Sequence, residues 1–185
     1  MGLLCEPTYA QSLKDLFLKM PQEVCPLLSE YNRLELVDNQ KNGKPMQTRN
    51  LLSTITKMET LTDEYAHLIA TPSSEKTFKL LPLSDGNHLI LVVSTVRCDS
   101  LTDSSISFYA TDWQPLPATS YIPSLTNFPS DDFCQISIAP TSNQLTITTS
   151  QPLALRIDGG TPPVTTTTTQ QWVWNAEENK FVVSL

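Results

Sequence analysis

The chain has 185 residues, a formal net charge of −7 and a sequence pI near 4.7. This length fits one domain. Its 12 Lys and Arg residues are scattered, whereas proteins that bind nucleic acid or an anionic membrane surface gather their cations into clusters. Both are therefore disfavoured as partners. No stretch approaches the roughly 20 apolar residues of a membrane span, so we expect a soluble domain.

The first ten residues are typical of the end of a secretion signal. Leu3 and Leu4 suit the end of an apolar segment, and Thr8-Tyr9-Ala10 places a small residue at each end of a cleavage site. Cleavage after Ala10 predicts that residues 1–10 are a signal-peptide remnant and that residues 11–185 form one exported domain. The alternative is an ordinary N-terminus, because no basic segment precedes the leucines.

Residues 12–40 have the spacing of two helices. Ser12 is suited to cap a first helix, which carries apolar residues at helical spacing up to Met20 and ends at Pro21. Ser29 is suited to cap a second helix, which Asn42-Gly43 would stop. Together the two helices offer an apolar stripe that needs a sheet to pack against.

From residue 46 onward the apolar residues alternate, as they do in strands. His88–Arg97 is the most apolar run and predicts a central strand, and Asp85-Gly86 before it predicts a hairpin turn. The predicted strands are 54–61, 65–70, 76–80, 88–97, 105–109, 133–139, 144–150, 153–158, 168–174 and 180–184. Helices followed by strands predict an α+β fold, with N-terminal helices packed on predominantly antiparallel sheet and the strands in one or two β lobes.

The connection near 112–130 is rich in proline and aromatic residues. Its Trp113, Tyr121 and Phe128 are our candidates for a binding surface, lining a groove for a peptide or a glycan. The alternative is that these rings cover the end of a sheet. Both uses suit large rings, which bury much apolar surface in cores and in interfaces.

Four cysteines follow no metal-ligand spacing. Cys5 would leave with the signal peptide. Cys98 and Cys134 lie at or near predicted strands, and in an oxidising compartment they are candidates for a disulfide. Buried free thiols are the alternative.

Several blocks of the sequence carry a family resemblance. They are Phe17–Pro21, Pro26–Asp38, Leu61–Tyr65 and Phe108–Trp113, of which the Asn-Arg-Leu…Val-Asp string within the second is the most unusual. Through them, residues 12–130 resemble an uncharacterised family of secreted proteins from Bacteroidales bacteria. The resemblance implies export, in agreement with the Ala10 site, and brings no catalytic residues with it.

The sequence offers no recognisable catalytic set. It lacks the nucleophile-elbow, zincin, P-loop and dinucleotide-binding motifs. The only histidines, His67 and His88, fall among apolar strand neighbours, where a hydrogen-bonded or rim position is more typical than a ligand. The acidic sets Asp63-Glu64, Asp99/Asp103 and Asp131-Asp132 all fall at turns, where Asp commonly caps the backbone. We therefore expect no catalytic residue, no metal site and no cofactor.

These observations favour a non-enzymatic periplasmic or secreted domain that binds a protein or an envelope component. One alternative is a glycan- or peptide-directed hydrolase with dispersed carboxylates, which would show two carboxyl groups about 5–10 Å apart. Another is an inhibitor-like or scaffold domain, which would show a large exposed apolar patch on a sheet.

Overall fold

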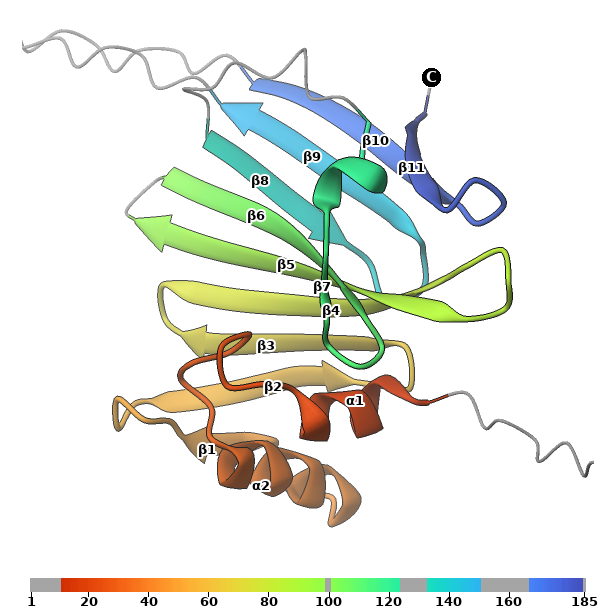
Figure 1. The fold of residues 1–185 in the computed structure, drawn as a ribbon. Helices are drawn as coiled ribbons and strands as arrows, with labels where there is room; N and C mark the ends of the chain where they lie inside the picture. The colour runs from red at the N-terminus through yellow and green to blue at the C-terminus, as the bar shows by residue number, and fades with distance from the viewer. Residues whose placement is uncertain (1–10, 99–100, 124–132, 151–166, 185) are drawn as a thin grey trace, which may run out of the picture.

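The fold has two helices, a large sheet and a small sheet (Figure 1). The structure, a computed structural model, describes residues 11–98, 101–123, 133–150 and 167–184. The predicted α+β class is confirmed. No helix within the described ranges is long and apolar enough to cross a membrane.

The two helices begin at the predicted serines. In α1 (Leu13–Lys19), the Ser12 hydroxyl accepts a hydrogen bond from the Asp15 backbone N–H. In α2 (Glu30–Lys41), Ser29 and Asn32 form a capping box, in which each side chain bonds the backbone N–H of the other residue. Capping supplies partners for N–H groups that the first helical turn leaves unpaired. A short polar side chain before an apolar run is therefore enough to fix where each helix starts.

The large sheet is an antiparallel meander in which each strand pairs with the next in sequence. Its strands are β1 (Gln47–Arg49), β2 (Ile55–Leu61), β3 (Tyr65–Thr71), β4 (Ser74–Pro82), β5 (His88–Cys98), β6 (Leu101–Ala110) and β7 (Pro115–Leu116). The predicted central strand is β5, which pairs with β4 over His88–Val96 and with β6 over Leu89–Cys98. The meander leaves β1 at one edge of the sheet.

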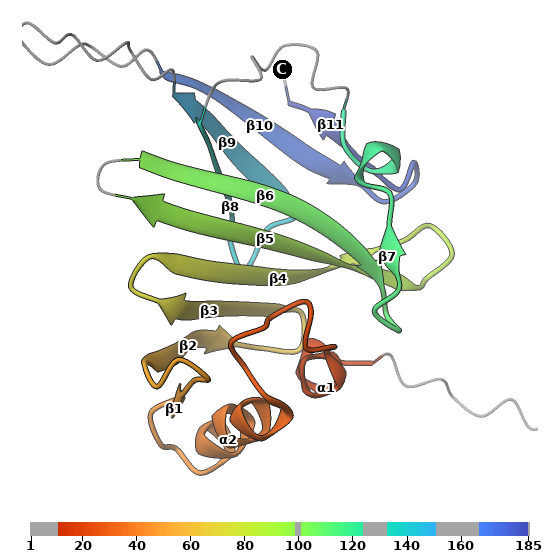
Figure 2. The same ribbon diagram turned by 60° about the vertical axis from the view of Figure 1, so that its left-hand side comes forward.

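The second group of predicted strands forms a separate four-stranded antiparallel sheet. Its order is β11-β10-β9-β8, with β8 (Phe133–Ile138), β9 (Gln144–Ser150), β10 (Thr167–Asn175) and β11 (Lys180–Val183). The predicted strand 153–158 lies outside the described residues. Figure 2 shows the small sheet rising from the β6 side of the large sheet, at the opposite end from α2 and β1.

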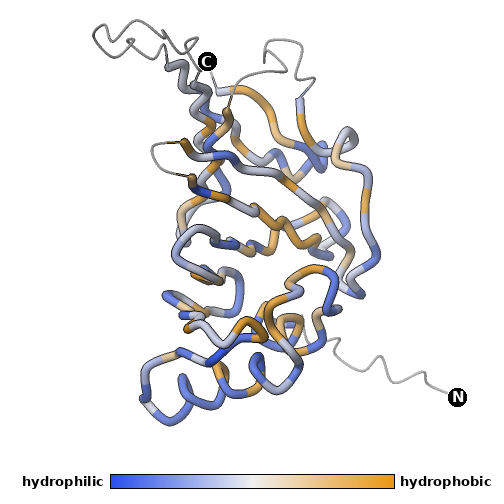
Figure 3. Tube along the Cα trace, turned by 90° about the vertical axis from the view of Figure 1, so that its left-hand side faces the viewer, coloured by the Kyte–Doolittle hydropathy of each residue, from blue (hydrophilic) through white to orange (hydrophobic). Residues whose placement is uncertain are grey.

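The large sheet buries apolar side chains on both faces. Along β5, Ile90 and Val92 face the helices, whereas Leu91 and Val93 face the small sheet. The hydrophobic colour of these central strands contrasts with the mostly hydrophilic α2 in Figure 3. The helix-side core includes Leu13, Leu16, Phe17, Leu36, Val37, Leu68 and Phe78, and the inter-sheet core includes Leu81, Phe108, Leu145, Ile147, Trp172, Trp174 and Phe181.

Candidate binding surface

The turn between β1 and β2 exposes two adjacent leucines at the edge of the large sheet remote from the small sheet (Figure 1). Leu51 is 59% exposed and Leu52 is 63% exposed. Single exposed apolar residues are ordinary on a protein surface, but these two belong to a part of the sequence in which exposed apolar residues are frequent. Of the nine large hydrophobic residues exposed in the described ranges, five lie between positions 31 and 55: Tyr31, Leu34, Leu51, Leu52 and Ile55.

Asn50 holds this turn in place from inside. Its side-chain oxygen accepts hydrogen bonds from the backbone N–H groups of Leu52 and Thr54, at 3.0 and 3.1 Å. Its side-chain nitrogen donates to the Ala70 carbonyl on β3 and to the hydroxyls of Thr54 and Thr56. Asn50 is only 4% exposed. One buried amide therefore ties the exposed turn to the neighbouring strands.

The backbone of the turn is strained and is held by further contacts. Ser53 has a φ of 60°, a left-handed conformation that costs a non-glycine residue on the order of 1 kcal/mol. The Arg49 guanidinium donates to the Ser53 carbonyl at 2.7 Å, and the Leu51 N–H donates to the Leu27 carbonyl at 3.1 Å. These bonds compensate the strain and order the two leucines before any partner arrives.

Helix α2 covers the free edge of β1. Asn32 donates to the Arg49 carbonyl at 3.0 Å, and Asn39 donates to the Gln47 carbonyl at 3.2 Å. The Thr48 hydroxyl donates to the Glu35 carboxylate. Because side-chain amides already occupy these carbonyls, a partner strand cannot pair with them. Contact at this end must therefore use side chains.

Two cations, Arg49 and Lys57, lie on one strand face beside the leucine turn. Residues 39–58 contain Lys41, Lys44, Arg49 and Lys57 and not one Asp or Glu. Arg49 pairs with Ile55 across β1 and β2, and Lys57 lies two residues along the same strand face. Within the described residues, neither Lys44 nor Lys57 makes a side-chain hydrogen bond or an ion pair. We call Arg49, Leu51, Leu52, Ile55 and Lys57 the leucine-turn surface.

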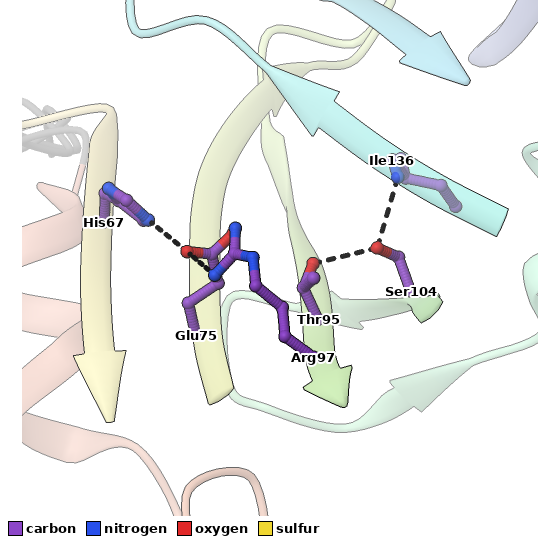
Figure 4. A network of polar contacts seen from close by, with 6 residues as sticks. All are labelled: His67, Glu75, Thr95, Arg97, Ser104 and Ile136. Carbon is purple, nitrogen blue, oxygen red and sulfur yellow. Dashed lines mark hydrogen bonds and ion pairs between the residues drawn. The ribbon is translucent and has the colours of Figure 1, made fainter. Parts of the chain in front are cut away.

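A second polar cluster crosses β3, β4 and β5 on the sheet face away from the helices (Figure 4). Arg97 binds the Glu75 carboxylate through two nitrogens at 2.7 and 2.8 Å, and His67 Nε2 lies 3.4 Å from the same carboxylate. Burial raises the pKa of Glu75, but the hydrogen bonds and charge of Arg97, with a contribution from His67, outweigh it and leave the pKa below its ordinary value. The cluster fastens three strands together and contains no nucleophile.

A hydroxyl pair links the two sheets beside this cluster (Figure 4). The hydroxyls of Thr95 and Ser104 lie 2.9 Å apart, and Ser104 accepts a hydrogen bond from the Ile136 N–H on β8 at 3.1 Å. Asp103 accepts from the Cys134 N–H at 3.2 Å. The side chains of β6 thus take up N–H groups of β8, which places these polar residues in the architecture of the fold.

Comparison with known proteins gives a family and a fold. Residues 6–180 match the family described as "Protein of unknown function (DUF3256)". The chain belongs to this family. A solved domain of an uncharacterized protein from Porphyromonas gingivalis W83 superposes on this DUF3256 member with a TM-score of 0.74 and 21% sequence identity, covering 96% of this chain and 100% of that chain. At that identity the similarity shows the fold. No curated protein matches.

The predicted aromatic surface is divided between two cores of this DUF3256 domain. Trp113 is buried, donates from its indole nitrogen to the Leu16 carbonyl at 3.0 Å and meets Phe78 edge-on. Tyr121 is half-buried and packs on Phe108 in the inter-sheet core. Phe128 lies outside the described residues. Trp113 and Tyr121 therefore cover the sheet, and they do not line one groove together.

The predicted disulfide is absent from the structure, where Cys98 and Cys134 are both free cysteines. The reason lies in the strand order. Cys98 pairs with Leu101 at the end of β5, whereas Cys134 on β8 lies beyond β6, beside Asp103. Strand β6 therefore lies between the two positions, so the two thiols are not neighbours in the fold. Burial, with the charge of Asp103, raises the pKa of the Cys134 thiol to about 11, so it is a poor nucleophile.

The described residues hold no group of three or more His, Cys, Asp or Glu side chains that could bind a metal ion. Asp103 lies within β6 and not at a turn, and its carboxylate accepts from the Cys134 N–H of β8, whereas Asp63 accepts from the Leu13 N–H through its main-chain carbonyl. Asp99 and the Asp131-Asp132 pair lie outside the described ranges.

The leucine-turn surface escaped the sequence analysis, although two signals of it are visible. One is the run of residues 39–58, which contains four Lys or Arg residues and no Asp or Glu, and which a count of cations alone does not single out. The other is Leu51-Leu52 standing between Asn50 and Ser53, where a turn would expose both leucines. Neither signal shows that the turn is rigid, because that depends on Asn50 reaching Ala70, 20 residues away.

Proposed function

We propose that this DUF3256 domain is an exported, non-enzymatic binding module that docks on a component of the cell envelope through the leucine-turn surface. The observation that carries the proposal is the pair of exposed leucines on a turn that buried hydrogen bonds hold rigid. Fixing a contact before binding removes the entropy cost of ordering it during binding. Burying the exposed surface of the two leucines in a contact would contribute hydrophobic free energy, roughly 25 cal/mol for each Å² of apolar surface removed from water.

Export is supported by the Ala10 cleavage pattern. The binding role is supported by the position of the polar clusters. The Glu75 and Ser104 groups bond protein partners on neighbouring strands, which is what structural residues do. By contrast, the side chains of Leu51 and Leu52 are exposed, and the Lys57 side chain makes no hydrogen bond or ion pair within the described residues.

Co-sedimentation with isolated cell envelopes tests this function. The wild-type chain should sediment with the envelopes, and L51S/L52S should remain in the supernatant. The matched control V173S/V183S replaces two exposed apolar residues elsewhere on the surface, Val173 at 39% and Val183 at 46% exposure, and should sediment as the wild type does. Equal sedimentation of all three proteins would show that the leucine turn is not the docking surface.

A further inference from the structure

The leucine-turn surface combines apolar and cationic groups in the way that a peripheral membrane contact requires. From this geometry we infer that it docks on the surface of an anionic lipid bilayer. The inference rests on the proposed function and names its ligand. It departs from the expectation drawn from the scattered cations, because the fold places Arg49 and Lys57 on one strand face beside the turn.

The apolar part lies at the tip. Leu51 and Leu52 occupy the turn itself, and Ile55, 43% exposed, follows at the start of β2. A bilayer interface takes up such side chains readily, because burying their surface among acyl chains removes it from water. The backbone of a turn that enters the interface needs its polar groups satisfied internally. Asn50 and Arg49 satisfy the Leu52 and Thr54 N–H groups and the Ser53 carbonyl.

The cationic part stands behind the tip. Arg49 is placed at the turn by its bond to Ser53, and Lys57 lies on the same face of the strand pair. Long Lys and Arg side chains reach headgroups while their stems lie against apolar surface. Two acids of α2 are already engaged, since Glu35 accepts from Thr48 and Asp38 lies 3.8 Å from Lys41, whereas Glu59 follows Lys57 on β2 and is exposed.

Charge also selects this end of the molecule over the rest. Residues 39–58 hold four of the 12 cations and none of the 19 acids, which leaves eight cations against 19 acids elsewhere. An anionic surface therefore repels the remainder of the chain and attracts this segment. A neutral or hydroxyl-rich partner gains nothing from this arrangement, whereas anionic headgroups do.

Sedimentation of the purified full chain with lipid vesicles tests the inference. The probes are vesicles of phosphatidylcholine alone and of phosphatidylcholine mixed with phosphatidylglycerol. The chain should bind the mixed vesicles and should bind the neutral ones on the order of tenfold less, and added salt should remove most of this difference. L51S/L52S should lower binding to the mixed vesicles about tenfold or more.

K44E/K57E is the second variant, since neither lysine supports the fold through a side-chain bond within the described residues, and it should also lose binding on the order of tenfold. K14E/K19E on α1 changes the net charge equally and should bind as the wild type does. Equal binding to both vesicle types, no binding to either, or equal losses in the two charge variants would overturn the inference. If envelopes still retain the chain through Leu51 and Leu52 while vesicles do not, the proposed function stands and its ligand is a protein.

Discussion

Replacing Asn50 by alanine should destabilise the domain and loosen the leucine turn together. The Asn50 side chain takes part in five hydrogen bonds, two to turn N–H groups and three to Thr54, Thr56 and Ala70. The Ala70 carbonyl keeps a partner in N50A, because the Thr56 hydroxyl also donates to it at 2.8 Å. The four remaining losses, at about 0.5–1.5 kcal/mol for each net hydrogen bond, sum to about 2–6 kcal/mol.

Urea unfolding followed by circular dichroism measures this change as a shift in the free energy of unfolding. N87A is the control, because Asn87 is an exposed turn residue whose side chain bonds only Asp85, and it should cost about 0.5 kcal/mol or less. Hydrogen exchange should show faster exchange of the Leu52 and Thr54 amides in N50A. A cost below about 1 kcal/mol with unchanged exchange would refute the role assigned to Asn50.

Three further predictions concern the rest of the fold. Burial raises the pKa of Glu75 but Arg97 and His67 bring it below the ordinary value, so its contribution to stability is present above the unfolded-state pKa and is lost as the pH falls through the folded one. E75Q should therefore lose less stability than the wild type between neutral and acidic pH, and a steeper acid loss would contradict this. W113A should lower the free energy of urea unfolding by about 3–5 kcal/mol, because it removes a buried indole and its hydrogen bond to Leu16. An almost unchanged free energy of unfolding would mean that Trp113 is not part of the core. In a C5S background, the thiol reagent DTNB should react fastest with exposed Cys98 and slowest with buried Cys25. Equal reaction rates at Cys98 and Cys25 would show that the helix-side core opens readily.

The sequence predicts the local structure of this chain well, because local chemistry decides it. Ser12 and Ser29 cap the two helices where the sequence places the caps. Alternating apolar positions identify β6, because the pleat directs successive side chains to opposite faces, and the continuous apolar run His88–Arg97 identifies β5. The sequence left one or two β lobes open, and the structure has two sheets.

Long-range partners are what the sequence leaves open. Trp113 is suited equally to a groove or a core until Leu16, 97 residues away, is found beside its indole nitrogen. Cys98 and Cys134 qualify for a disulfide until β6 is found between them. The candidate site follows the same rule, since two leucines become an ordered docking surface only where a buried asparagine reaches another strand.

Fluorescence from a probe at position 52 tests the docking surface most directly. An environment-sensitive label on L52C, in a chain whose Cys5 and Cys98 are serine, reports whether the tip of the turn leaves water when envelopes are added. The same label on V173C reports on the outer face of the small sheet. A blue shift at position 52 with no shift at position 173 is the predicted result. Unchanged emission at position 52, or a shift at position 173 alone, would contradict docking through the leucine-turn surface.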